Sequence, residues 1–132
     1  MKTGSSTRIV LVDDHNLVRS GMAALLRQDG RFDVVGEATN GLEALEKLRE
    51  VPCDLLIIDL AMPRLGGIEV IEELRRRDKR IRILVLSMYD DAQFAARAIK
   101  NGANGYLLKH AMDGELFDAI EQVLTGDEFV SE

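Results

Sequence analysis

The chain has 132 residues, of which 46% are hydrophobic and 30% charged, and its formal net charge is −6. This length and composition fit one globular domain and exclude a fibre or a disordered chain. The acidic balance excludes nonspecific binding to the nucleic-acid backbone as a property of the chain as a whole.

The sequence contains no segment that predicts a membrane span or a secretory signal. Its apolar runs are far shorter than the ~18 residues that cross a bilayer, and the polar start MKTGSST lacks the apolar core of a signal peptide. We therefore expect no membrane contact and a cytoplasmic location. The single cysteine, Cys53, stands at the mouth of a predicted strand, where we expect a reduced packing residue rather than a reactive thiol.

Predicted strands and helices alternate along the chain. Residues 1–7 have no periodicity and predict a flexible tail, and residues 127–132 predict the beginning of a linker. Short apolar runs predict five strands, at Ile9–Val12, Phe32–Ala38, Leu55–Ile58, Ile83–Leu86 and Gly105–Leu108. Helical spacing predicts five helices, at about Asn16–Gln28, Gly41–Glu50, Ile68–Arg76, Asp91–Asn101 and Asp113–Thr125. This alternation, with short connections, predicts an α/β fold with a parallel sheet covered by helices on both faces.

The first, fourth and fifth helices carry further signals. The pattern in the first is set by Leu17, Val18, Met22, Leu25 and Leu26, which recur at helical spacing. Gly102 is placed to cap the fourth helix. The fifth has the most regular amphipathic pattern, with Leu116, Ala119, Ile120, Val123 and Leu124 on one face.

Polar side chains stand just past the ends of four predicted strands. Asp13 and Asp14 follow the first, Asp59 the third, Ser87 the fourth and Lys109 the fifth. The carboxyl ends of parallel strands lie at one edge of the sheet, so we expect these residues to converge there. Neighbouring carboxylates repel one another unless a cation lies among them, and their oxygens suit Mg²⁺. An ammonium and a hydroxyl suit phosphoryl oxygens, and we interpret Asp59 as a nucleophile that accepts a phosphoryl group.

Each of these residues also has an ordinary interpretation. Asp13 or Asp14 could cap the first helix, Asp59 could cap a loop, Ser87 could be a turn residue and Lys109 a surface charge. Their coincidence at several strand ends favours the shared site. A basic cluster at Arg75–Arg77, Lys79, Arg80 and Arg82 could contact phosphates, but the glutamates before it favour a solvated helix end.

Four ordered motifs resemble the response-regulator receiver domain of two-component signalling. They are VDDH at Asp13 and Asp14, DLAMPRLGG from Asp59, LVLSMYD with Ser87, and GANGYLLK ending at Lys109. The segments VDDHNLVRSGMAALL and GYLLKHA are similar to the NarL/FixJ (LuxR-type) subfamily. The resemblance implies a receiver domain over residues 8–126. It also implies a flavodoxin-like (CheY-like) doubly wound five-stranded parallel sheet, in the strand order 2-1-3-4-5, with five surrounding helices.

The resemblance also implies a role for each site residue. Asp59 would take a phosphoryl group from a phosphohistidine on a sensor histidine kinase. Asp14 and Asp59, with the backbone carbonyl of Ala61, would bind Mg²⁺ directly, and Asp13 would assist through water. Lys109 would pair with the phosphoryl group. The domain would promote its own phosphorylation and dephosphorylation and would not be an enzyme acting on other substrates.

By the same resemblance, Ser87 and Tyr106 would form a switch. The hydroxyl would move toward the phosphate while the ring changes its packing, so that a new charge biases a surface of the fourth helix, fifth strand and fifth helix. Alternatively, Tyr106 is an ordinary half-buried aromatic residue. We expect a phosphorylation-promoted homodimer through the last helix or the fourth-helix face. DNA binding is expected only through a C-terminal helix-turn-helix domain that this sequence lacks.

His110 departs from many receivers, which have a cis proline after the lysine. A cis bond without proline costs about 2.5–4 kcal/mol, so we expect a trans connection. We expect His15 to be a loop residue and His110 a surface residue, both without metal-ligand partners. A haloacid-dehalogenase-like phosphatase would need a second acid where Ala61 stands, and a nucleotide-binding module would need glycine-rich motifs that are missing. A phosphorylation-independent receiver-like dimerisation module stays open.

Overall fold

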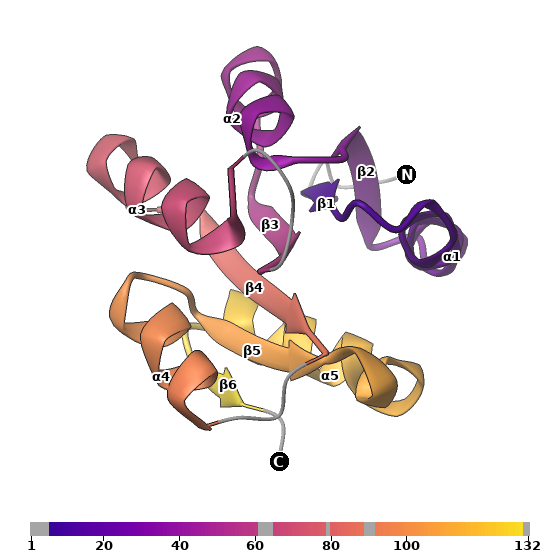
Figure 1. Ribbon diagram of the computed structural model, residues 1–132. Helices are drawn as coiled ribbons and strands as arrows, with labels where there is room; N and C mark the ends of the chain where they lie inside the picture. The colour runs from indigo at the N-terminus through magenta and orange to yellow at the C-terminus, as the bar shows by residue number, and fades with distance from the viewer. Residues whose placement is uncertain (1–5, 61–64, 79, 89–91, 131–132) are drawn as a thin grey trace.

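The computed structural model describes residues 6–60, 65–78, 80–88 and 92–130, which form one parallel sheet with helices on both faces (Figure 1). The strands are β1 (Thr7–Val12), β2 (Phe32–Ala38), β3 (Leu55–Asp59), β4 (Arg82–Ser87), β5 (Gly105–Leu108) and β6 (Phe129–Val130). The helices are α1 (Asn16–Gln28), α2 (Gly41–Glu50), α3 (Gly67–Arg77), α4 (Ala92–Lys100), the 3-10 helix η1 (Lys109–Ala111) and α5 (Met112–Leu124). The sheet order is β2-β1-β3-β4-β5-β6, which confirms the predicted order of the first five strands.

The sixth strand adds to the predicted five-stranded sheet and lies within residues 127–132, where the sequence predicts the beginning of a linker. Phe129 lies opposite Gly105 and Val130 opposite Tyr106 in a parallel pairing with β5. Gly126, with φ of +100°, lies between α5 and this strand. Gly105 allows the close approach, because a Cβ atom there would lie 3.2 Å from the Phe129 carbonyl oxygen and 2.7 Å from Val123. Phe129 then packs against the core on the α5 side.

Alternate residues of the central strands enter two separate cores, because neighbouring side chains of a strand point to opposite faces. Leu56 and Ile58 of β3 pack on the face covered by α2, α3 and α4, whereas Leu55 and Ile57 pack on the face covered by α1 and α5 (Figure 1). All four side chains are completely buried. The continuous apolar run in the sequence therefore corresponds to a strand that is covered on both faces.

The helical faces agree with the predicted pattern in α5 but only in part in α1. In α5 the buried residues are Leu116, Ala119, Ile120 and Val123. In α1, Met22 and Leu26 are buried, but the side chains of Leu17 and Leu25 are 87% and 40% exposed. Helix α1 thus turns a narrower face toward the sheet than its apolar pattern predicts.

Capping contacts define the start of α2 and the end of α4. The Asn40 side chain accepts a hydrogen bond from the Glu43 N–H at the start of α2 (2.9 Å), and the Glu43 carboxylate accepts one from the Thr39 N–H (2.9 Å). Gly102 ends α4 with φ of +122°, and its N–H donates to the Ile99 carbonyl, which confirms the predicted cap.

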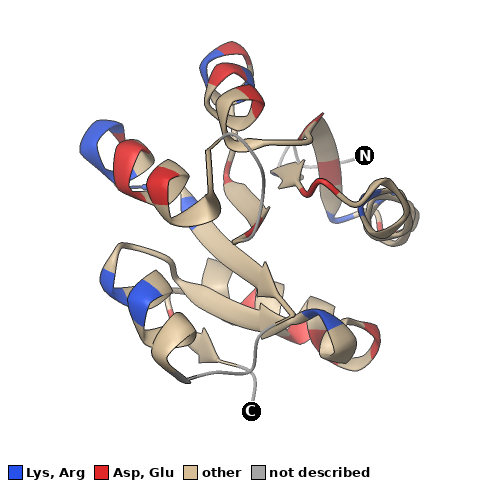
Figure 2. Ribbon diagram, viewed as in Figure 1, with Lys and Arg blue, Asp and Glu red and all other residues tan. Residues whose placement is uncertain are grey.

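Three arginines of the basic cluster at the end of α3 make side-chain contacts within the molecule. Arg75 is half-buried and donates to the Gly102 carbonyl and to the Asn104 side chain, both at 3.0 Å, so the prediction of a solvated helix end is wrong for this residue. Arg76 and Arg77 form ion pairs with Glu73, and Figure 2 shows the basic and acidic residues together on α3. The Glu73 carboxylate thus offsets part of the positive charge of Arg76 and Arg77.

The surroundings of Cys53 test its predicted role as a packing residue. The Cys53 thiol is partly buried and donates to the Leu55 carbonyl at 3.2 Å, and burial raises its pKa to about 11. This environment fits a packing residue, since nucleophilic thiols have a low pKa.

Among the described helices, none has both the length and the apolar character to cross a bilayer.

Candidate functional site

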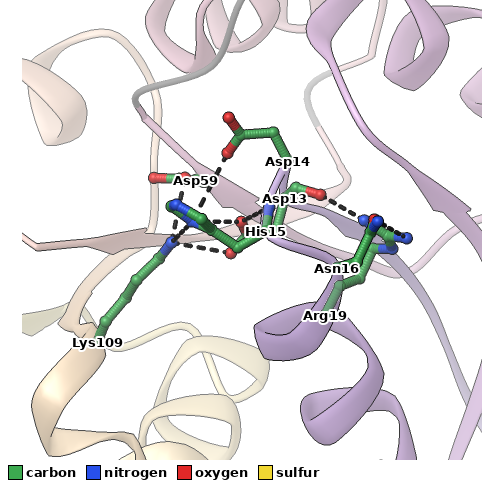
Figure 3. A network of polar contacts seen from close by, with 7 residues as sticks. All are labelled: Asp13, Asp14, His15, Asn16, Arg19, Asp59 and Lys109. Carbon is green, nitrogen blue, oxygen red and sulfur yellow. Dashed lines mark hydrogen bonds and ion pairs between the residues drawn. The ribbon is translucent and has the colours of Figure 1, made fainter.

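The carboxyl ends of four strands bring the predicted site residues to one edge of the sheet. Asp13 directly follows β1, Asp59 is the last residue of β3, Ser87 is the last residue of β4, and Lys109 directly follows β5. The strand register supports this arrangement, because Val12 pairs with Ile58 at the ends of β1 and β3. Figure 3 shows Asp13, Asp14, Asp59 and Lys109 pointing toward one another from these different elements.

The three carboxylates differ in their exposure. Asp13 is fully buried, Asp59 is 3% exposed, and the Asp14 side chain is 32% exposed. Neither Asp13 nor Asp14 is the N-cap of α1, which is His15. The Oδ1 atom of Asp13 instead accepts a hydrogen bond from the His15 N–H at 2.8 Å. Two buried acids beside a partly exposed one form an acidic cluster, of which Asp14 is the member that reaches solvent.

Lys109 supplies positive charge to this acidic cluster. Its Nζ lies 3.0 Å from Asp13 Oδ2 and 3.2 Å from Asp59 Oδ2, and its side chain is only 10% exposed. Burial alone would lower the pKa of Lys109, but the contacts and charges of Asp13 and Asp59 outweigh it, so that the pKa lies above the ordinary value of 10.5. The side chain is therefore a permanent cation at neutral pH.

The two predicted switch residues are both buried. Ser87 is 1% exposed at the end of β4, and Tyr106 is 2% exposed in β5. The Tyr106 ring belongs to the core on the side of α2, α3 and α4. It is therefore more deeply enclosed than a half-buried aromatic residue. The Ala61 carbonyl, predicted as a metal ligand, lies outside the described residues.

His15 is a member of the site that sequence reasoning missed. The prediction that it has no metal-ligand partners is wrong, because its Nδ1 atom lies 3.3 Å from Asp13 Oδ1 and 3.7 Å from Asp14 Oδ1. The available signal was its place directly after the two acids at a strand end. His110 is exposed, as predicted. The described chain contains no cis peptide bond, in agreement with a trans connection after Lys109.

A pocket of about 380 Å³ lies beside the acidic residues. It is lined by His15, Val18, Met88, Lys109 and His110. Met88, directly after β4, has 69% of its surface exposed. This pocket gives an approach to Lys109 from solvent.

The acidic residues fit a divalent cation. One ligand atom from each of Asp13, Asp14, His15 and Asp59 lies within 4.8 Å of the others. The buried Oδ2 atom of Asp13 has no donor other than the Lys109 ammonium among the described residues. Carboxylate oxygens at this spacing are the donors that Mg²⁺ takes in proteins.

Comparison with known proteins decides the family. Residues 9–121 match the response regulator receiver domain. The chain belongs to this family. The nitrate/nitrite response regulator NarL of Escherichia coli K12 is 35% identical over 132 residues, which are all of this chain and 61% of NarL. The oxygen regulatory protein NreC of Staphylococcus carnosus is 36% identical over 124 residues, which are 93% of this chain and 57% of NreC.

Solved structures agree with this assignment. A LuxR-family two-component response regulator from Aurantimonas sp. SI85-9A1 superposes with a TM-score of 0.89 at 39% identity, covering 95% of this chain and 89% of that one. The signal receiver domain of the putative NarL of Mycobacterium tuberculosis gives a TM-score of 0.87 at 33% identity, covering 92% and 98%. The receiver thus has the flavodoxin-like (CheY-like) fold and is of the NarL/FixJ (LuxR-type) subfamily. The chain spans between 52% and 61% of the length of the curated relatives it matches.

Proposed function

We propose that this receiver is switched by phosphorylation of Asp59, which accepts a phosphoryl group from a phosphohistidine of a cytoplasmic sensor histidine kinase. One Asp59 oxygen attacks phosphorus, the bond between phosphorus and the histidine nitrogen breaks, and the imidazole leaves with the electron pair. The observation that carries this proposal is the convergence of Asp59 with Asp13, Asp14 and Lys109 at one sheet edge. Without a cation, two neighbouring carboxylates would repel an incoming phosphoryl group.

The described side chains account for the positioning part of the reaction. Lys109 Nζ contacts Asp59 Oδ2 at 3.2 Å and so holds the acceptor carboxylate in place. The same ammonium neutralises charge on the transferred phosphoryl oxygens. Ser87, at the end of the neighbouring strand β4, offers a hydroxyl for another phosphoryl oxygen.

Mg²⁺ is part of this proposal. Asp14 and Asp59, with the Ala61 carbonyl, would hold the ion, and Asp13 would contribute through water. When bound, Mg²⁺ neutralises the carboxylates and the phosphoryl oxygens in the transfer. The donor set supports this assignment, because it offers three carboxylates of which two are buried.

The readout is a change of packing between β4 and β5. We propose that the Ser87 hydroxyl moves toward the phosphoryl group and that the Tyr106 ring, buried beside α4 in the structure described, repacks in response. The added charge favours one of two arrangements of the α4–β5–α5 surface. That surface would then control a transcriptional output domain, which supplies DNA binding.

Intact-mass analysis after incubation with Mg²⁺ and a small phosphodonor tests this function. We expect one phosphoryl group on the wild-type chain and none on Asp59→Asn, which keeps the side-chain size and removes the nucleophile. Circular dichroism of the variant serves as the folding control. Persistent labelling of Asp59→Asn would place the acceptor elsewhere, and labelling that is independent of Mg²⁺ would contradict the role of the ion.

A further inference from the structure

His15 adds an imidazole nitrogen to a cluster whose other donors are carboxylate oxygens. Its Nδ1 atom lies 3.3 Å from Asp13 Oδ1 and 3.7 Å from Asp14 Oδ1 (Figure 3). Neighbouring ligand atoms around an ion with bonds of about 2.1 Å are separated by about 3 Å. The imidazole therefore needs only a small shift to share one ion with the carboxylates.

The backbone directs His15 toward the acids. His15 is the N-cap of α1, with φ of −89° and ψ of 103°, but its side chain makes no capping hydrogen bond to the helix. Its own N–H donates instead to Asp13 Oδ1 at 2.8 Å. The residue is thus tied to the buried acid through its backbone, while the ring lies over the carboxylates.

Lys109 shows that these side chains already converge on one positive charge. Its ammonium lies 3.0 Å from Asp13 Oδ2, 3.2 Å from Asp59 Oδ2 and 3.3 Å from His15 Nδ1. The Asp13 Oδ2 atom is fully buried and has no other donor in the described part of the chain. An ammonium can only donate, so its contact with His15 Nδ1 is a hydrogen bond in the tautomer whose ring proton lies on Nε2. In that tautomer Nδ1 also has the lone pair that a metal ion requires.

We propose that His15 is a metal ligand through Nδ1, and that this receiver site binds a first-row transition-metal ion such as Co²⁺ or Zn²⁺ more tightly than Mg²⁺. Imidazole suits these ions, whereas Mg²⁺ takes oxygen donors and retains several waters. The inference rests on the proposed function, because it uses the same acidic cluster. It adds the chemical class of ion that this cluster binds most tightly and the side chain that causes the difference in affinity.

Calorimetric titration with Co²⁺ and, separately, with Mg²⁺ tests the proposal. For His15→Ala we expect the Co²⁺ affinity to fall by about tenfold or more, and the Mg²⁺ affinity to change by less than about twofold. The matched control is His110→Ala, which removes the exposed histidine of the adjacent pocket and should leave both affinities unchanged. Equal ratios of Co²⁺ to Mg²⁺ affinity in all three chains would overturn the assignment.

A spectroscopic readout on the wild-type chain needs no variant. In long-range nitrogen–proton spectra of the histidine rings, Zn²⁺ should shift the Nδ1 signal of His15 and leave that of His110 in place. An unshifted His15 signal at saturating Zn²⁺ would overturn the assignment. Failure of both Mg²⁺ and Co²⁺ to bind would instead contradict the metal site of the proposed function, so the two failures are distinguishable.

Discussion

Lys109 places one positive charge between two buried carboxylates, and a divalent ion must compete with it for the same oxygens. Lys109→Met removes the ammonium and leaves Asp13 and Asp59 uncompensated. We expect the metal-free domain to lose about 3 kcal/mol of unfolding free energy, because a buried pair is costly to break. Mg²⁺ should restore more stability to this variant than to the wild type.

Urea unfolding with and without Mg²⁺ measures both effects, and Lys100→Met, at an exposed position of α4, is the control. Equal stabilisation by Mg²⁺ in the wild type and Lys109→Met would contradict the competition.

The ion pairs of Lys109 also make stability depend on pH. Burial lowers the pKa of Lys109, but the hydrogen bonds and charges of Asp13 and Asp59 raise it by more, so that the pKa in the folded state lies above 10.5. The folded state therefore keeps the proton to a higher pH than the unfolded chain does. The ion-pair contribution is therefore complete below pH 10.5 and is lost as the pH rises through the folded-state pKa.

The Cys53 thiol is a second group that makes the unfolding free energy depend on pH. Burial raises its pKa from 9.0 to about 11, so the folded state keeps a proton that the unfolded chain releases. The unfolding free energy should fall between these two pH values, by about 2–3 kcal/mol in total. A serine hydroxyl does not titrate in this pH range, so Cys53→Ser should remove this decrease of the unfolding free energy with pH. Urea unfolding at several alkaline pH values measures the difference, and identical slopes in both chains would contradict the buried thiol.

At the level of the elements, two glycines should respond to alanine with opposite signs. Gly102 has φ of +122° at the end of α4, and an added Cβ would lie 2.6 Å from Arg75 Cγ. Gly102→Ala should therefore cost about 1–3 kcal/mol. Gly21 lies inside α1, and its Cβ would meet no atom within 4 Å. Gly21→Ala should stabilise by about 0.5–1 kcal/mol. Thermal unfolding measures both, and a neutral Gly102→Ala would argue against the described turn.

Most elements could be predicted because their residues carry a local period. The bounds of α1, β2, α2 and β5 agree with the sequence patterns. The sixth strand could not be predicted, since two residues have no period and their pairing depends on Gly105 and Tyr106 of β5, which lie on the other side of α5 in the sequence. The exposure of Leu17 could not be predicted either. A helical period shows that apolar residues share one face of a helix, but it does not show how much of that face the sheet covers.

At the level of the whole molecule, the gathering of the site follows from the topology. A parallel sheet places the ends of β1, β3, β4 and β5 at one edge, so residues after apolar runs could be expected to meet there. The position of His15 could not be predicted in the same way. Its side chain is set by the start of α1 and by Asp13 and Lys109, and the contact with Lys109 joins residues that are 94 positions apart.

Self-association is the expected response of the whole molecule to phosphorylation. Sedimentation with the phosphoryl mimic beryllofluoride and Mg²⁺ should show a larger mass than sedimentation without them. The apolar face of α5 is buried in the core, whereas Phe94 on α4 is 36% exposed, so the fourth-helix face is the favoured contact surface. The α4 variant Phe94→Asp should then weaken association.

The control for this experiment is Asp59→Asn, whose mass should not respond to beryllofluoride. An unchanged mass of the wild-type chain at high concentration would contradict the prediction. A dimer that forms equally without beryllofluoride would instead favour the phosphorylation-independent dimerisation module.

The short strand β6 also bears on how the molecule avoids aggregation. An open strand edge offers unpaired amide groups that can recruit a strand from another molecule. By pairing with Gly105 and Tyr106, β6 occupies the outer side of β5 and is itself too brief to template a further strand. At the opposite edge, β2 carries the charged residues Asp33 and Glu37, which disfavour pairing with a strand of another molecule. The two edges of the described sheet thus both carry features that disfavour edge-to-edge association of receivers.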